Sequence, residues 1–422
     1  MTTSNRNGLT DDPRSVAGPG KRPVVLILAQ HYLPGVKAGG PTRSIRNLVA
    51  SLADGFDFHI YTTNRDFGSR EPYPAIEVNQ WIARADSRVW YSNHRTVSAG
   101  RLGRVVAEIC PDIIHVNSFM NPGFSILPLV SRSWAGVGRR AAWIIAPRGE
   151  FAPGALGIKA TKKRMYLRVA RMLGLHRGLV WHATGDREAE DIRREYGVAD
   201  GDVMIAPNVT EAVGDDPLPV IARGPGDRLE VCFLGRVTPM KNVSFAVESL
   251  ARLRNVVRFH VYGPIEDRGY AEECNRIASR AGGRLVVEWH GEVPHDRVRA
   301  ALAAHDLLLI PTRGENFGHA IFEALAVGVP VLVSDQTPWR DLDLKGVGWV
   351  RPLGDPQIFA DVIDAFAALS VKERTAMRNR VRSYARAVSM ETANADASRR
   401  LFDEALRRTR GDGSRRHRTD RS

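Results

Sequence analysis

Glu315 and Glu323 lie eight positions apart in the stretch Gly314-Glu-Asn-Phe-Gly-His-Ala-Ile-Phe-Glu-Ala-Leu-Ala-Val-Gly-Val-Pro330. The stretch predicts a glycine-bearing loop after the apolar run 306–310, then a helix over 317–327 that ends at the glycine and proline. The free backbone N–H groups at such a helix start can bind an anion. At 1.5 Å per residue, the two glutamates lie up to ~12 Å apart along the axis. This spacing suits an elongated ligand with hydroxyls at both ends and a diphosphate between them, which is the layout of a nucleotide sugar.

A second set of suitable residues lies in Phe233-Leu-Gly-Arg-Val-Thr-Pro-Met-Lys-Asn242, which predicts a strand, a glycine-bearing loop and a helix start. Arg236 and Lys241 are five positions apart across this loop. Both side chains can therefore converge on one diphosphate, the guanidinium as a planar fork and the ammonium as a point charge. The alternative is that they are surface cations beside an ordinary turn.

Short apolar strands and amphipathic helices alternate along the chain, which is typical of doubly wound parallel sheets. The predicted strands of the first half are 24–29, 58–62, 113–116, 143–146 and 179–183, with helices from Thr42 and over 102–109. Proline, glycine and acidic residues at 213–227 predict a linker. The predicted strands of the second half are 230–234, 257–262, 285–289, 306–310 and 329–333; its predicted helices are 242–253, 270–280, 294–303 and most of 355–408. Ligands bind at the carboxyl ends of such strands, so the chemistry is expected between the halves.

The glutamate stretch, together with Pro-Thr-Arg-Gly-Glu-Asn-Phe-Gly at 311–318 and Thr-Pro-Trp-Arg-Asp-Leu at 337–342, resembles the family 4 retaining glycosyltransferases. The likeness runs over about residues 23 to 405 and is strongest to bacterial exopolysaccharide and lipopolysaccharide members. It implies the GT-B fold, in which two Rossmann-like α/β domains face a cleft and a C-terminal helix crosses back to the N-terminal domain. The alternative is a surface glutamate and a helical salt-bridge partner, because two glutamates at this spacing also occur by chance.

Composition, which gives the tails and the linker, and the resemblance, which gives the domains and the crossing helix, together divide the chain into six parts. These are a disordered tail at 1–22, an acceptor-binding domain at 23–212, the linker at 213–227, a nucleotide-sugar-binding domain at 228–385, the crossing helix at 386–410 and a basic disordered tail at 411–422.

By resemblance, Arg236 and Lys241 stabilise the departing nucleoside diphosphate, as a metal ion does in other transferases. Glu323 would accept hydrogen bonds from the ribose hydroxyls, and Glu315 would hold hydroxyls of the sugar. His115, at the end of a predicted strand, corresponds to a histidine near the reacting sugar, although a lone histidine there is more often structural. The remaining donor-binding residues lie in loops at strand ends or at the helix start: Gly235, Gly263, Glu292, Asn316, Phe317 and Gly318. The loops at 263 and 292 can equally be plain turns.

The acceptor side is less defined. Val36-Lys-Ala-Gly-Gly-Pro-Thr-Arg43 resembles the glycine loop after the family's first strand, with Gly39, Gly40 and Arg43 as candidates, although a simple turn remains open. Pro147-Arg-Gly-Glu150 departs from the His-Asp pair of many members. Arg148 is therefore expected near a phosphate or the donor sugar, and Glu150 near the acceptor hydroxyl. His182-Ala-Thr184 and Glu188, at the end of the next predicted strand, form a further candidate.

The chain has 422 residues, three widely spaced cysteines, a formal net charge of +13 and a pI of about 10. The early apolar run 24–29 is too short for a signal peptide or membrane span, so a cytoplasmic location is expected. Part of the positive charge lies on a predicted helix at 159–177 that includes Lys162 and Lys163. That helix predicts either peripheral contact with the anionic inner face of the plasma membrane or an ordinary solvated face.

No cofactor or essential metal is expected. Asp341-Leu-Asp343 fits the Asp-x-Asp pattern of metal-dependent transferases only by coincidence, and no His, Cys or Asp group has the sequence spacing of a metal site. The implied activity is retaining transfer of a hexose from a nucleotide sugar to a growing, lipid-linked polysaccharide. The alternatives are a degenerate nucleotide-sugar-binding protein and a basic nucleic-acid-binding protein. The last is disfavoured because no nucleic-acid-binding motif is present, so no specific nucleic acid is expected as a partner.

Overall fold

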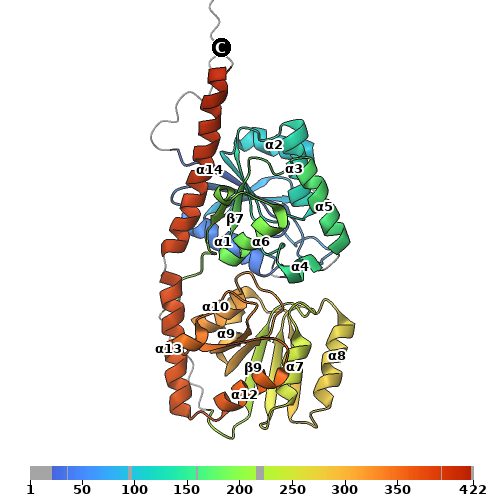
Figure 1. Ribbon diagram of the computed structural model, residues 1–422, viewed down its shortest axis with the longest axis vertical. Helices are drawn as coiled ribbons and strands as arrows, with labels where there is room; N and C mark the ends of the chain where they lie inside the picture. Colours follow the sequence, from blue (N-terminus) through green and yellow to red (C-terminus); the bar gives the residue numbers. More distant parts are fainter. Residues whose placement is uncertain are drawn as a thin grey trace, which may run out of the picture.

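The computed structural model of the chain describes residues 21–35, 37–93, 97–157, 160–214, 223–390 and 392–419. They form two α/β domains stacked end to end, and two C-terminal helices run along one side of both (Figure 1). The predicted tail at 1–22 lies almost wholly outside the described residues, as do Val36, Lys159 and the centre of the predicted linker at 215–222.

In the described part of the first domain, one sheet has eight strands in the order β3-β4-β2-β1-β5-β6-β7-β8. Only β3 runs antiparallel to its neighbour. The strands are β1 (Val24–Leu28), β2 (Asp57–Thr63), β3 (Trp81–Ala83), β4 (Ser87–Ser92), β5 (Ile113–Val116), β6 (Ala142–Ile145), β7 (Val180–Ala183) and β8 (Val203–Ile205). The helices are α1 (Gly40–Leu52), α2 (Ala99–Ile109), the π-helix η1 (Pro122–Ile126), α3 (Leu127–Ala135), α4 (Pro153–Gly157), α5 (Ala160–Met172), α6 (Asp186–Tyr196) and the 3₁₀ turn η2 (Asp200–Asp202).

The second sheet is parallel throughout, with the order β11-β10-β9-β12-β13-β14. Its strands are β9 (Leu229–Leu234), β10 (Val257–Tyr262), β11 (Leu285–Gly291), β12 (Leu307–Ile310), β13 (Val331–Ser334) and β14 (Gly348–Arg351). Its helices are α7 (Val243–Ala251), α8 (Arg268–Ser279), α9 (His295–Ala303), α10 (His319–Ala326), α11 (Leu342–Lys345) and α12 (Pro356–Ala367). This is the strand order of the Rossmann fold, and the α/β prediction is confirmed.

The strand orders determine where a ligand can bind. Successive strands are added to each sheet first in one direction and then in the other. The switch lies between β1 and β5 in the first domain and between β9 and β12 in the second. Loops at the carboxyl ends of such strands diverge and leave a crevice. The predicted Gly39, Gly235 and Glu315 loops follow β1, β9 and β12, so all three begin at these two crevices.

Every residue of β1, β5, β6 and β12 is buried, as expected for parallel strands covered by helices on both faces. The strands β3, β4, β8 and β14 were not in the predicted set. β4 lies beside the edge strand β3, and only some of its six residues are buried. The other three are shorter. Each of these three lies at a sheet edge and is only partly buried, so its apolar pattern is weak.

The crossing helix is observed. Helices α13 (Val371–Met390) and α14 (Thr392–Thr419) follow the second sheet in sequence, yet α14 lies along the first domain (Figure 1). Phe402 of α14 is fully buried in the first domain's core, with its ring centroid 5.2 Å from that of Phe56. The backbone is helical to Thr419, beyond the predicted start of a disordered tail at 411. Arginine favours helix and no proline interrupts 392–419, which accounts for the difference.

Candidate functional site

A cleft of about 1120 Å³ lies between the two domains, and residues of both form its wall. Its lining includes most of the residues singled out from the sequence: Gly39, Gly40, Arg43, Arg148, Gly235, Arg236, Lys241, Gly263, Glu292, Glu315, Asn316, Phe317 and Gly318. They come from loops and a helix start after six different strands, which tertiary folding brings together at the facing ends of the sheets.

Glycines shape the floor of the cleft in the second domain. The Gly235 N–H donates to the Tyr262 carbonyl (2.9 Å), and the Gly263 N–H donates to the Gly291 carbonyl (2.6 Å). Gly263 has φ 134°, and a Cβ there would lie 1.9 Å from the Gly235 carbonyl oxygen. Only glycine fits, so the ends of β9, β10 and β11 present bare backbone to the cleft.

The two predicted cations lie on this floor, each with a carboxylate partner. The Lys241 Nζ donates to Glu315 Oε2 at 2.5 Å, and both side chains are 20% exposed. Arg236 Nη1 donates to Glu266 at 2.8 Å, and its guanidinium lies 5.4 Å from the ring centroid of Phe67 in the first domain. Each cation thus lies at the cleft wall with a partner that a diphosphate could replace.

The loop after β12 continues into α10, which starts at His319 and not near Phe317 as the sequence predicted. Gly318 is the N-cap residue with φ 84°, and a Cβ there would lie 2.8 Å from Ile321 Cδ1, so the helix begins after this turn. The Phe317 carbonyl accepts a hydrogen bond from Trp339 Nε1 (2.6 Å), which fixes the loop. Asn316 lies against the first domain, because a Cβ added to Gly149 would be 3.3 Å from its Cβ.

Glu323, one turn into α10, is buried behind the cleft wall. It accepts a hydrogen bond from Arg43 of the first domain, and its side chain is 12% exposed. Its second oxygen, Oε2, has no hydrogen-bond partner among the described residues. Burial raises the pKa of Glu323, and the Arg43 guanidinium partly opposes that rise.

Further polar contacts join the domains beside this pair. His319 Nε2 lies 2.8 Å from Ser44 Oγ, Lys37 Nζ lies 3.1 Å from Glu292, and Arg187 donates to Gln336 at 3.0 Å. Burial, with Arg43 and Arg148 nearby, lowers the pKa of His319 to about 3. The imidazole is therefore neutral at physiological pH, and Ser44 and His319 share one neutral hydrogen bond.

On the first-domain side, Arg148 reaches the cleft from a strained backbone position with φ 56°. It donates to the side-chain oxygens of Asn117 (2.8 Å) and Asn208 (3.1 Å). Burial lowers its pKa to about 10, and Glu188 opposes that shift. The Glu188 carboxylate accepts from the backbone N–H groups of Gly149 (2.6 Å) and Thr184 (2.8 Å), so it holds the loop that carries Arg148.

His115 and Glu150, like Glu323, lie away from the lining that the structure describes. His115 is fully buried, neither ring nitrogen has a described hydrogen-bond partner, and burial lowers its pKa well below the usual value. Glu150 turns inward and accepts from Ser118 Oγ (2.5 Å) and the Met120 N–H (2.6 Å). These hydrogen bonds tie Glu150 to the loop that follows β5. Its carboxylate therefore does not face the cleft, where it was expected to meet an acceptor hydroxyl.

The basic helix is also separate from the cleft. Lys162 and Lys163 lie on α5, where Lys163 Nζ donates to the Ala155 carbonyl at 2.6 Å. Among the described residues, no helix combines the length and the apolar character needed to cross a membrane.

The Asp-x-Asp pattern has other partners. Asp341 accepts from the Tyr384 hydroxyl (2.8 Å), and Asp343 accepts from Arg351 and the Val350 N–H (both 2.7 Å). Both carboxylates therefore brace the structure around α11. The sequence did not predict that His260, Glu288 and His290 would converge, because they lie on two strands 28 to 30 positions apart.

The sequence also assigned no role to His319 or Lys37, although both lie inside quoted motifs. The signal for His319 was its position directly after the Gly318 turn, at the first residue of a helix that faces the cleft. Its contact with Ser44 depends on the packing of the domains, which the sequence pattern does not encode.

Family comparisons match both halves of the chain. Residues 39–209 match the model described as Glycosyl transferase 4-like domain, and residues 220–388 match that described as Glycosyl transferases group 1. A D-inositol 3-phosphate glycosyltransferase of Xylanimonas cellulosilytica is 30% identical over 234 residues, covering 52% of this chain and 55% of the relative. The phosphatidyl-myo-inositol mannosyltransferase of Mycobacterium leprae is 29% identical over 196 residues, covering 44% and 50%. The chain thus spans about half the length of the curated relatives it matches.

Solved structures share the fold at low identity. Anabaena HepE in complex with UDP and glucose has a TM-score of 0.63 at 18% identity, covering 91% of this chain and 99% of HepE. Sucrose-phosphate synthase from Thermosynechococcus elongatus has a TM-score of 0.65 at 19% identity, with the same coverage. WaaG, a glycosyltransferase involved in lipopolysaccharide biosynthesis, has a TM-score of 0.60 at 16% identity, covering 90% and 99%.

Proposed function

The chain belongs to the group 1 glycosyl transferases, with a glycosyl transferase 4-like domain ahead of the group 1 domain, and from this premise we propose that it is a retaining hexosyltransferase. It would move a hexose from a nucleoside diphosphate sugar to a hydroxyl group without a metal ion. The observation that carries the proposal is that Arg236 and the Lys241–Glu315 ion pair line the cleft between the domains, beside Gly235 and Gly263.

The reaction needs positive charge where the leaving group gains negative charge. As the bond between the sugar's anomeric carbon and the diphosphate breaks, Lys241 and Arg236 would exchange Glu315 and Glu266 for phosphate oxygens. Such preorganised charge in a partly desolvated cleft is worth about 10²–10³ in rate for each group. Glu315, released from Lys241, would accept hydrogen bonds from sugar hydroxyls, and Glu323 would accept them from the ribose through its unpartnered oxygen.

Retention requires that the acceptor hydroxyl attack the face of the sugar from which the diphosphate leaves. We assign no protein nucleophile, and the acceptor proton would pass to the departing phosphate. The first-domain wall formed by Gly39, Gly40 and Arg148 would hold the acceptor or the donor's sugar phosphate. Bare backbone at the glycines allows close approach, and Arg148 keeps its charge because its pKa, about 10, is above physiological pH.

A UDP-sugar donor and a lipid-linked glycan acceptor are the finer parts of the proposal. HepE was solved with UDP and glucose, which supports UDP as the leaving group. The mannosyltransferase relative acts on phosphatidyl-myo-inositol, and WaaG takes part in lipopolysaccharide biosynthesis, which supports an acceptor of bacterial exopolysaccharide or lipopolysaccharide type.

Helix α5 supports peripheral contact with an anionic membrane. Met165, Val169 and Met172 on this helix are 64%, 41% and 78% exposed. Exposed basic residues lie beside them on the same helix: Lys162, Arg164, Arg168 and Arg171. Apolar side chains between cations suit the boundary between acyl chains and anionic headgroups. We expect co-sedimentation with anionic vesicles at low salt that is lost at high salt and in Arg164→Glu/Arg168→Glu, but kept in Arg268→Glu/Arg276→Glu on α8. Absence of binding at low salt would refute this contact.

The function is tested by calorimetric titration with UDP, GDP and ADP in the presence of a chelator, followed by transfer assays with the sugar nucleotides of the base that binds. We expect one nucleotide to bind without metal. If none binds, or if binding occurs without sugar transfer or donor hydrolysis, a degenerate binding protein becomes the better description. Salt-sensitive binding of duplex DNA that persists after removal of residues 411–422 would favour a nucleic-acid-binding protein.

A further inference from the structure

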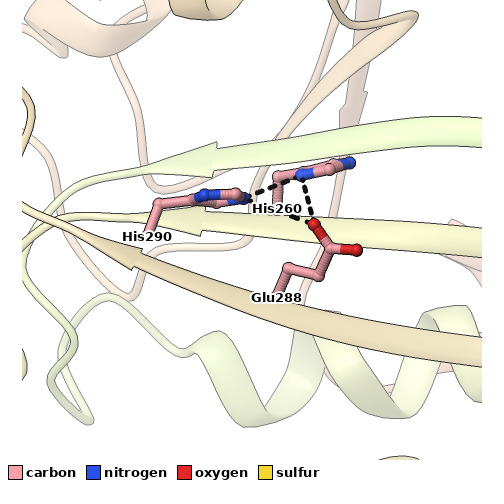
Figure 2. Close-up of side chains that lie close together, drawn as sticks. All are labelled: His260, Glu288 and His290. Carbon is pink, nitrogen blue, oxygen red and sulfur yellow. Dashed lines mark hydrogen bonds and ion pairs between the residues drawn. The ribbon is translucent and has the colours of Figure 1, made fainter.

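A cluster of imidazole and carboxylate groups lies on the second sheet, outside the cleft wall. His260 on β10 is paired in register with Glu288 on β11, and His290 follows two positions later on the same face. Figure 2 shows that the three side chains converge from these adjacent strands. His260 Nδ1 lies 2.8 Å from His290 Nε2 and 3.4 Å from Glu288 Oε2, and His290 Nε2 lies 3.7 Å from Glu288 Oε2.

These separations match a metal-ligand set. Two ligands that each lie about 2.1 Å from a tetrahedral zinc ion are about 3.4 Å apart. The three measured distances, 2.8, 3.4 and 3.7 Å, bracket that value. Widening the shortest separation from 2.8 Å to about 3.4 Å, a shift of about 0.6 Å, would let all three atoms reach one ion.

Outer partners orient two of the three groups. Glu230 Oε2 lies 2.7 Å from His260 Nε2, so it accepts the proton there and leaves the Nδ1 lone pair facing the cluster. Arg258 Nε lies 3.0 Å from Glu288 Oε1, which holds that carboxylate with Oε2 toward the histidines. A carboxylate behind a ligating histidine is the usual outer shell of a metal site.

The hydrogen count also favours a cation. With the hydrogen of His260 on Nε2, His260 Nδ1 and Glu288 Oε2 face the cluster as acceptors, and only His290 Nε2 can bring a hydrogen. Glu288 Oε2 and His260 Nδ1 then face each other at 3.4 Å as two acceptors. A metal ion bound between the two atoms would remove this repulsion.

We propose that His260 Nδ1, His290 Nε2 and Glu288 Oε2 form a binding site for one divalent transition-metal ion of the zinc class. Two imidazoles and one carboxylate suit Zn²⁺, Co²⁺ or Ni²⁺ and do not suit Mg²⁺, which prefers oxygen ligands. His290 is at the surface, with a 35% exposed side chain, so an ion can enter and water can complete the coordination.

The site would brace the edge of the second domain. A metal ion there would join β10 to the edge strand β11, whose end leads through Gly291 to Glu292 in the cleft wall. The proposal assigns no part of sugar transfer to the metal, so it stands or falls independently of the proposed activity.

The test is titration of tag-free, chelator-treated full-length protein with Zn²⁺ alone, followed by calorimetry, with Co²⁺ absorption as a report on coordination. We expect one tight equivalent, a Co²⁺ spectrum typical of four-coordinate geometry, and a rise in the melting temperature on Zn²⁺ addition. A 100-fold excess of Mg²⁺ should not displace the ion.

Variants separate this site from adventitious binding. Glu230→Gln should weaken Zn²⁺ binding about 10- to 100-fold, as loss of an outer partner does, and His290→Ala should weaken it by more than that. His290 is exposed on an edge strand, so the variant should retain the circular dichroism of the parent. The matched control is His295→Ala, because His295 is 34% exposed and lies 3.4 Å from a carboxylate of Glu211 without a second imidazole bonded to it. Unchanged Zn²⁺ affinity in His290→Ala, equal loss in His295→Ala, or no stoichiometric binding in the parent would overturn the proposal.

Discussion

Substitution of Glu323 by glutamine tests the donor site with little change of shape. The Glu323 carboxylate accepts a hydrogen bond from Arg43, and its other oxygen, Oε2, has no described partner. Glutamine keeps the side-chain volume but replaces one acceptor oxygen with an NH₂ group and removes the charge. If Oε2 binds a ribose hydroxyl, the variant loses a charge-assisted hydrogen bond to the nucleotide.

The size of the loss follows from that single contact. A hydrogen bond to a charged group contributes about 1.5–3 kcal/mol. At about 1.4 kcal/mol for each factor of ten, Glu323→Gln should weaken nucleoside diphosphate binding about 10- to 150-fold. The free nucleoside should lose affinity by the same factor, because the contact is to the ribose and not to the phosphates.

Glu211→Gln is the matched control. Glu211 also pairs across the domains, with Arg299 on α9 at 3.2 Å, but its side chain is 30% exposed and it is not among the described residues that line the cleft. Both variants lose one acid from an interdomain ion pair, so a general effect of domain docking should appear in both. The assay is calorimetric titration with nucleoside and nucleoside diphosphate, alongside melting temperatures. Full nucleotide affinity in Glu323→Gln, or an equal loss in Glu211→Gln, would refute the assignment of Glu323 to the ribose.

Three further predictions concern catalysis, backbone fit and pH. Lys241→Ala should lower kcat about 10²–10³-fold while free nucleoside affinity stays unchanged, because the ammonium would act on the leaving diphosphate; a steady-state assay with normal turnover would exclude that role. Gly263→Ala should lower the melting temperature and abolish nucleotide binding, because the new methyl carbon would lie 1.9 Å from the Gly235 carbonyl; a variant with parental stability would contradict the geometry. Burial lowers the pKa of His176 and of His182 from 6.5 to about 3, so the unfolded chain binds more protons between these values. Stability should therefore fall as pH drops below 6.5 toward 3, and a melting temperature unchanged between pH 7.5 and pH 5 would refute this.

Local patterns were sufficient for much of the fold. The apolar runs that became β1, β5, β9, β10 and β12 were found close to their observed bounds, because buried parallel strands are continuously hydrophobic. The start of α10 was predicted two residues early, since the positive φ at Gly318 delays the first helical turn. Strands β3, β4, β8 and β14 were missed because partly exposed residues leave a weak apolar pattern.

For the site, the residues predicted in short loops next to strands line the cleft, whereas two residues chosen by motif position do not. The loops at Gly235 and Glu315 were expected to line the cleft. They follow β9 and β12, the two strands between which the direction of strand addition reverses. His115 and Glu150 also follow or end strands, yet their side chains turn into the first domain's interior. Side-chain direction at a strand end depends on local packing, which one sequence does not reveal.

The sequence by itself determined the alternation of strands and helices, the positions of the glycine turns, and the cations and carboxylates that those turns carry. These properties follow from periodicity and from residue chemistry over a few neighbours. Only the tertiary structure decided which distant groups are partners: Arg43 with Glu323, Ser44 with His319, and His260 with Glu288 and His290. Such pairs depend on sheet register and on domain docking, and these are set by the burial of the whole core.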